Sequence, residues 1–180
     1  MYRLTLMSVF FHLTTNHRSS RMIQNSALVT AAVLILAYAT HAEVVQWTSC
    51  PTPENGAVSS CVIHEVNVDP CNEAVQRKPC ALKRGRNASI SFDYTADFTG
   101  DTLSSRAYWA SEIMDLPFLG MPLDACTSTV CPVVPGQRQQ YSVLLPISKK
   151  FPARTYDLKW KLWNAEEQEC CFMFAIKLVK

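Results

Sequence analysis

The sequence predicts an all-β protein with the pattern of a β-sandwich. Apolar residues alternate with period two in about six or seven segments, and turn-forming Pro, Gly, Asn and Asp separate those segments. No long segment shows the 3.6-residue period of a helix, and no repeat, low-complexity tract or linker divides the chain. A single β domain is therefore expected.

The first expected strand is "CVIHEVNV" at residues 61–68, where the alternation is imperfect. The next is "ASISFDYTADF" at residues 88–98, and its alternation is regular. One face of this second strand carries Ala88, Ile90, Phe92, Tyr94, Ala96 and Phe98. Because successive side chains of a strand point to opposite faces, these six residues are expected in the core.

Four further strands are expected downstream. Residues 106–114, "RAYWASEIM", and 140–147, "QYSVLLPI", are strand-like and more fully apolar. Residues 155–164, "TYDLKWKLWN", alternate again, with Tyr, Leu and Trp on one face and charged residues on the other. The last segment, "CCFMFAIKLVK" at 170–180, gathers its aromatic and aliphatic residues together with Cys170 on one face.

Residues 1–42 have the layout of a secretory signal peptide. They contain no Asp or Glu, and arginines precede the apolar run "ALVTAAVLILAYA" at residues 27–39. An uncleaved anchor is the weaker alternative, because a bilayer span takes about 20 apolar residues. Cleavage is expected after Ala42, and Met22 is an alternative start site.

Cleavage would leave one domain of 138 residues, 43–180, which is long enough for a single core. It would carry 14 Lys and Arg against 15 Asp and Glu, a net charge of −1. This balance argues against a nucleic-acid partner.

All eight cysteines follow residue 42. An even number in a secreted chain argues for four disulfides. Structural zinc prefers closely spaced Cys pairs with matching partners, whereas Cys71 and Cys80 enclose eight residues, and His64 is the only histidine after residue 42. We therefore expect no metal, and a short disulfide loop from Cys71 to Cys80 with Pro70 and Pro79 at its shoulders.

The chain after residue 42 lacks the common catalytic motifs. It has no Gly-rich phosphate loop and no G-x-S-x-G elbow, and nothing near His64 in the sequence marks a nucleophile. The thiols are expected in disulfides, which argues against a cysteine nucleophile. A binding protein without a cofactor is expected rather than an enzyme.

Several motifs in order resemble the ML-domain lipid-recognition family, and within it the Niemann-Pick type C intracellular cholesterol transporter 2 group. They are "VIHEVNVDPC…PCALKRG", "DACTSTVCPV", "YSVLLPISKKFP", "LKWKLWN" and the C-terminal strand, and together they run from about Val45 to Val179. The resemblance implies an immunoglobulin-like sandwich of two antiparallel sheets that part at one end and hold a lipid in a cavity between them.

The resemblance also implies a disulfide pattern. Carried over by motif, the pairs are Cys50–Cys171, Cys71–Cys80 and Cys126–Cys131. Cys61 and Cys170 have no counterpart in the usual six-cysteine pattern, and the segment after Cys50 is longer than usual. A Cys61–Cys170 bond is the simple completion, but adjacent Cys170 and Cys171 face opposite sides of a strand, so the two bonds could also be exchanged.

Three residues are implied to line the mouth of the lipid tunnel. Phe118 lies in the proline-rich segment "LPFLGMPLDAC", and Ile147 and Phe151 lie in "LPISKKFP", where the family often has Val and Tyr. Core filling is the alternative interpretation of aromatic residues and stays open for Trp160, Tyr94 and Phe92. A lining role is favoured for Phe118 and Phe151, because they lie in loop or edge contexts with prolines.

Two surface features are also expected. The stretch "RKPCALKRGR" at residues 77–86 is either a solvated turn or a basic rim that meets an anionic membrane surface or lipid headgroup. Asn87 begins an N-x-[ST] sequon and is expected to carry a glycan.

The expected function is a secreted, monomeric carrier of a sterol or other hydrophobic lipid, with transient contact to a membrane surface or membrane receptor. The alternatives are an innate-immune sensor of bacterial lipids and a ligand-independent secreted interaction module. The expected location is extracellular, with the lysosomal lumen as the second possibility.

Overall fold

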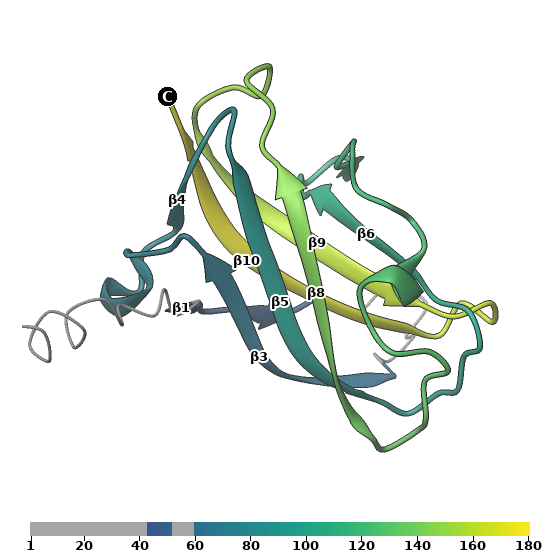
Figure 1. Ribbon diagram of the computed structural model, residues 1–180. Coiled ribbons are helices and arrows are strands. Elements are labelled where there is room, and N and C mark those ends of the chain that lie inside the picture. Colours follow the sequence, from purple (N-terminus) through teal and green to yellow (C-terminus); the bar gives the residue numbers. More distant parts are fainter. Residues whose placement is uncertain (1–42, 52–59) are drawn as a thin grey trace, which may run out of the picture. The chain divides into compact units, whose positions relative to one another are not determined.

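The computed structural model describes residues 43–51 and 60–180 (Figure 1). The expected signal peptide, its cleavage site and the alternative start at Met22 lie outside the described residues. The regular structure of the described part is almost entirely strand, with two short 3₁₀ helices, η1 (Ala74–Gln76) and η2 (Ala125–Thr127).

The strands form two sheets, which we call sheet A and sheet B. Sheet A has the order β1, β3, β5 and β8, with bounds Glu43–Val44, Cys61–Asp69, Asn87–Ala96 and Arg138–Pro146. Sheet B has the order β2, β10, β9, β6 and β7, with bounds Thr48–Ser49, Glu169–Val179, Thr155–Trp163, Ser104–Trp109 and Leu116–Pro117. A further strand of sheet B, β4 (Cys80–Lys83), pairs with the C-terminal half of β10.

The two sheets face each other as an open sandwich, which confirms the expected fold class (Figure 1). The expected inward face of β5 is buried at every position from Ala88 to Phe98. The inward face of β10 is also buried, and so is that of β9 apart from half-buried Tyr156. Period-two alternation therefore identified the strands that supply most of the core.

Aromatic rings fill the middle of the sandwich. Phe92 of sheet A stacks on Tyr141 with 4.8 Å between centroids and meets Phe172 of sheet B edge-on at 4.8 Å. Trp160 of sheet B lies edge-on to both Phe92 and Tyr141, at 5.9 and 5.8 Å. These rings bury a large apolar area, and their offset and edge-on geometries add to that gain.

Two local features differ from the expected strands. β6 ends at Trp109, so the strand-like interpretation of residues 110–114 is wrong: the Ser111 hydroxyl donates to the carbonyl of Met114 (2.7 Å) and closes a turn there. β4 was not expected, because its four residues are too few to show a period, and it pairs with β10 in parallel while the other strand pairs are antiparallel.

A bulge explains the imperfect alternation of β3. The register with β5 shifts between Ile63 and Glu65, so one additional residue, His64, is accommodated in β3. His64 is exposed, and its Nε2 lies 2.8 Å from the Thr95 hydroxyl. This is the environment of an ordinary strand histidine.

Four disulfides are present: Cys50–Cys171, Cys61–Cys170, Cys71–Cys80 and Cys126–Cys131. The Cys61–Cys170 bond joins β3 of sheet A to β10 of sheet B through the core. Adjacent Cys171 points the other way and bonds to Cys50, directly after β2. We call the end of the sandwich that contains the Cys61–Cys170 bond the disulfide end.

A buried asparagine orders the loops near the disulfide end. Asn164 follows β9 and is 3% exposed. Its amide nitrogen donates to the Thr99 carbonyl (2.9 Å), and its amide oxygen accepts from the backbone N–H groups of Glu166 and Gln168. Covalent and polar contacts thus fix the two sheets together at this end.

Candidate functional site

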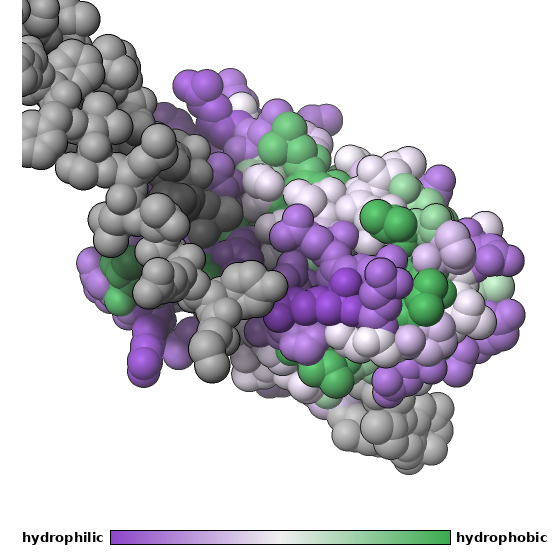
Figure 2. Space-filling model, turned by 60° about the horizontal axis from the view of Figure 1, so that its bottom comes forward, coloured by the Kyte–Doolittle hydropathy of each residue, from purple (hydrophilic) through white to green (hydrophobic). Residues whose placement is uncertain are grey.

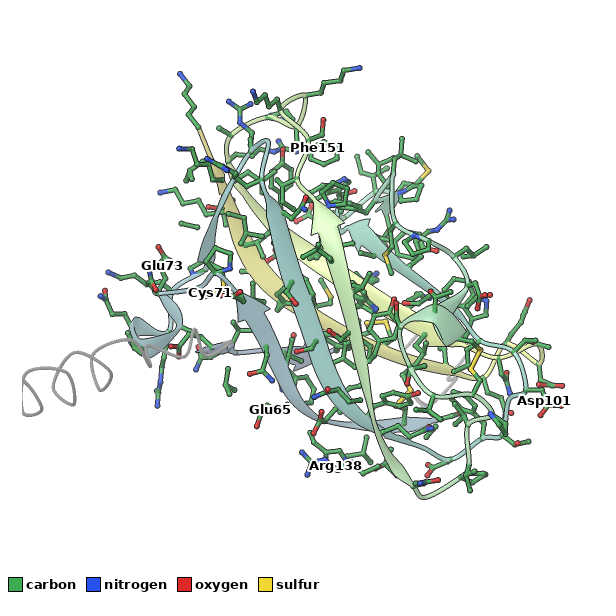
Figure 3. The ribbon with its side chains drawn as sticks, in the orientation of Figure 1. Glu65, Cys71, Glu73, Asp101, Arg138 and Phe151 are labelled. Carbon is green, nitrogen blue, oxygen red and sulfur yellow. A yellow bond between two sulfur atoms is a disulfide. The ribbon has the colours of Figure 1, made fainter. Side chains whose placement is uncertain are left out.

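The opposite end of the sandwich is defined by strand register. Asn87 at the start of β5 lies beside Pro146 at the end of β8, and Tyr156 near the start of β9 lies beside Ile176 of β10. Figure 3 shows Phe151 at this end, far from Asp101 and Arg138. We call it the aromatic end.

Four aromatic side chains from three segments meet there. Trp109 of β6 lies 5.2 Å from Phe118, 5.1 Å from Phe151 and 4.6 Å from Tyr156 between ring centroids. Phe118 and Phe151 are edge-on to each other at 5.4 Å. We call these four residues the aromatic cluster; it brings together two of the three residues expected at a tunnel mouth.

Backbone pairing places each expected residue. The Phe118 N–H donates to the Ala107 carbonyl (2.8 Å), which folds the β7 segment back onto β6 and over Trp109. Ile147 continues β8, and its N–H donates to the Arg86 carbonyl (2.9 Å), so it belongs to the same end. Phe118 and Ile147 are each 2% exposed, whereas Phe151 is half-buried.

The loop that carries Phe151 is held by one arginine. A terminal guanidinium nitrogen of Arg84 donates to the carbonyls of Lys149 (3.2 Å) and Phe151 (2.7 Å). Tyr156 donates its hydroxyl proton to the Pro152 carbonyl (2.9 Å) and carries the Arg154 guanidinium 4.6 Å above its ring. These contacts are non-covalent, and two of the three hydrogen bonds are exposed, in contrast to the Cys61–Cys170 bond at the disulfide end.

Cationic residues lie on two segments next to the aromatic cluster. The end of β4, the turn that leads to β5 and the Phe151 loop carry Lys83, Arg84, Arg86, Lys149, Lys150 and Arg154. Of these, Arg84 bonds to the Phe151 carbonyl and Arg154 lies over Tyr156. The Lys149 side chain crosses Gly85, where a Cβ would lie only 2.5 Å from its Cε and where φ is +80°, so this close approach needs glycine. Arg77 and Lys78 belong instead to the separate Cys71–Cys80 loop.

Exposed apolar side chains extend from the same end. Ile113 is 98% exposed and Met114 64%, in the turn between β6 and β7, and Leu116 and Leu119 nearby are also exposed. The turn is anchored by Asp115, which forms an ion pair with Lys159 and accepts from the Ser111 N–H (3.3 Å). On the face shown in Figure 2, by contrast, apolar side chains form separate patches among hydrophilic ones.

The described residues contain no cluster of three or more His, Cys, Asp or Glu that could hold a metal ion. No helix in ranges 43–51 and 60–180 is long and apolar enough to cross a membrane. Burial raises the pKa of Tyr94 and Tyr141 from the ordinary value of tyrosine, so both hydroxyls keep their protons at physiological pH.

Asn87 is exposed and is the first residue of β5. Its position leaves room for a glycan on the rim of the aromatic end, and glycosylation stays a prediction.

Two members of the aromatic cluster were not identified from the sequence. Trp109 lies in the expected strand 106–114, and Tyr156 on the expected inward face of 155–164. For Tyr156 a usable signal existed, because it stands near the start of its expected strand, next to the loop that carries Phe151. Trp109 gave no such signal, because it falls in the middle of the expected strand 106–114. Strand periodicity cannot separate such an end position from the core.

Comparison with known proteins agrees with this architecture. A family model of the ML domain matches residues 44–178. The chain is 42% identical over 130 residues to an MD-2-related lipid-recognition protein from Manduca sexta, covering 71% of this chain and 82% of the relative. It is 27% identical over 103 residues to an ecdysteroid-regulated 16 kDa protein of the same species, covering 56% and 71%.

A solved structure shares the fold. It is a Niemann-Pick type C2 protein from the Japanese carpenter ant, with a TM-score of 0.63 and 16% sequence identity, covering 74% of this chain and 99% of that one. The ML-domain model spans nearly all of the described sandwich. The chain therefore belongs to the ML-domain lipid-recognition family.

Proposed function

We propose that the protein is a secreted, monomeric carrier that binds a sterol or another hydrophobic lipid between its sheets. The observation that carries this proposal is the asymmetry of the sandwich. One end is tied through the core by Cys61–Cys170, whereas at the aromatic end the rings of the aromatic cluster and the Phe151 loop close the space between the sheets. The Cys71–Cys80 bond joins the end of β3 to β4 at a place apart from Phe151 (Figure 3). A lipid would enter at the aromatic cluster and part those rings. Its apolar surface would gain about 25 cal/mol per Å² on leaving water.

Phe118, Ile147 and Phe151 are the proposed lining residues at the opening. Trp109 and Tyr156 join them because they contact the same rings. The proposed mature domain is 43–180, with export through the secretory pathway. Family membership supports lipid binding rather than catalysis as the role of the domain.

Contact with a membrane is proposed at the same end. Ile113 and Met114 would enter the boundary between headgroups and acyl chains, while the surrounding Lys and Arg side chains would face anionic headgroups. Docking this end would bring the opening against the bilayer, so that a lipid could pass without crossing water.

Vesicle flotation tests the docking surface. Binding to vesicles of phosphatidylcholine with phosphatidylserine should fall for Ile113→Asp and for Lys149→Glu, and should weaken as salt increases. Val62→Asp, which changes another exposed apolar side chain on β3, is the matched control and should bind normally. Equal binding of all these variants would refute the docking surface.

Extraction of lipid from the natively secreted protein tests the function itself. A recovered sterol supports the carrier, and an acylated glycolipid favours a sensor of bacterial lipids. The sensor is considered because one of the two Manduca sexta relatives bears the name MD-2-related lipid-recognition protein. If no lipid is recovered and none binds in titration, the domain is a ligand-independent interaction module.

A further inference from the structure

One polar group inside the sandwich is left without a partner. Tyr141 lies on β8 and is fully buried, with its ring between Phe92 of sheet A and Trp160 of sheet B. Its hydroxyl oxygen is buried and forms no hydrogen bond with any described residue. A buried hydroxyl without a partner is costly, so it calls for an explanation.

The nearest hydroxyl groups do not satisfy it. Ser105 is fully buried, and its Oγ accepts from the Trp160 indole N–H (2.9 Å) and donates its proton to the Lys161 carbonyl (3.1 Å), so it has no proton left to donate to Tyr141. Ser105 and Ser128 are close enough to lower the pKa of Tyr141 against the larger, opposite effect of burial. Neither makes a hydrogen bond of acceptable geometry to the Tyr141 hydroxyl.

Tyr94 shows that the same fold can satisfy a buried tyrosine. It is also fully buried between the sheets, and its hydroxyl lies 3.0 Å from the Thr129 hydroxyl. The two tyrosines therefore differ in one respect: the Tyr94 hydroxyl has a partner within the chain, and the Tyr141 hydroxyl is free to donate and to accept.

The position of Tyr141 suits the inner end of a bound lipid. Tyr141 lies on β8, six residues before Ile147, which continues that strand at the aromatic end. At about 3.4 Å per residue, the distance along the strand between the two residues is about 20 Å. An extended sterol or acyl chain that begins at the aromatic end can reach this depth.

We propose that the Tyr141 hydroxyl determines specificity by hydrogen-bonding an oxygen at the buried end of the lipid, and so favours lipids with a hydroxyl or carbonyl group there. This inference rests on lipid binding between the sheets, as proposed above. A site with an unpaired polar group discriminates against an analogue that lacks the matching group.

The test uses two matched pairs of anionic probes. They are cholesterol sulfate with 25-hydroxycholesterol 3-sulfate, and hexadecanoate with 16-hydroxyhexadecanoate. In each pair the negative charge should keep one end of the probe beside the basic residues of the β4–β5 turn and the Phe151 loop. The additional hydroxyl, at the other end of the probe, then enters the sandwich. Within each pair that binds, the wild-type protein should hold the hydroxylated probe about tenfold more tightly.

Tyr141→Phe should remove this preference while leaving the affinity for the unhydroxylated probe unchanged. Its Tm should equal or exceed that of the wild type, because the lost hydroxyl has no partner. Tyr94→Phe deletes the same atom from the neighbouring tyrosine and should keep the preference.

Two results would overturn the inference: equal affinities within a bound pair, or a preference that persists in Tyr141→Phe. A clear fall in the Tm of Tyr141→Phe would also overturn it, since the hydroxyl would then already have a partner. Absence of binding by all four probes would instead overturn the proposed lipid function, and the role of Tyr141 with it.

Discussion

Replacing Phe151 with alanine tests whether the aromatic end is the path of the lipid. Phe151 is half-buried and contacts Trp109 and Phe118 through its ring, while its backbone is held by Arg84. Full burial of a Phe side chain contributes about 1.5–3 kcal/mol. A lipid that covers the exposed half would therefore lose about 1 kcal/mol in the variant, or about fivefold in affinity.

The assay is titration of the purified protein with a fluorescent sterol, beside thermal unfolding and a dissociation time course. We expect a higher Kd, a faster dissociation and a small change in Tm for Phe151→Ala. Leu119→Ala removes a 73% exposed side chain from the same region and should leave the Kd unchanged. Trp160→Ala, in the core, should cost about 3–5 kcal/mol of stability.

Phe118 is less suitable for this test than its loop position in the sequence suggested. It is 2% exposed, so Phe118→Ala would remove core packing as well as any lipid contact. If Phe151→Ala binds the sterol with wild-type affinity and dissociation rate, its ring is not in the lipid path, and the aromatic cluster is only packing.

Four further predictions concern the disulfides, the glycan and the Phe151 loop. Thiol labelling of the denatured, non-reduced protein should give no adduct, and any labelled cysteine would contradict the four disulfides. The double change Cys61→Ala with Cys170→Ala should lower the free energy of unfolding by about 3 kcal/mol, measured in urea, because with Cys50–Cys171 intact it opens a ring of only about 14 residues; a loss below about 1 kcal/mol would contradict the inter-sheet tie. Glycosidase treatment should increase the gel mobility of the secreted wild-type protein, and Asn87→Gln should abolish this change. A wild-type protein whose mobility does not change on treatment would refute glycosylation. Arg84→Ala should accelerate lipid dissociation because the Phe151 loop loses two hydrogen bonds. Arg84→Lys should not restore the slow rate, because the guanidinium plane fixes the direction of its N–H donors and a lysine ammonium does not; full rescue by lysine would show that charge alone matters.

Strand alternation predicted the core well because the two sheets bury one face each. The residues of β5 and its continuation, from Ala88 to Phe98, illustrate this, since each apolar position on the inward face is buried. β4 could not be predicted, because its parallel pairing with β10 depends on contacts between distant parts of the chain. The turn at residues 110–114 was missed because its apolar residues resemble a strand, although Ile113 points to solvent.

The candidate site was predicted only in part. The resemblance to a family identified Phe118, Ile147 and Phe151, but no local pattern indicated that Trp109 would lie between two of them. The unpaired hydroxyl of Tyr141 was equally hidden, because hydrogen-bond satisfaction is a property of the packed interior and not of the strand that carries the residue.

The two disulfides at adjacent cysteines close a covalent ring. The ring runs from Cys50 along the chain to Cys61, crosses to Cys170, passes through one peptide bond to Cys171 and returns to Cys50. A single proteolytic cut between Cys50 and Cys61 therefore opens the ring without dividing the molecule. The nicked protein would keep its mass, apart from one added water, until a reductant separates the two pieces.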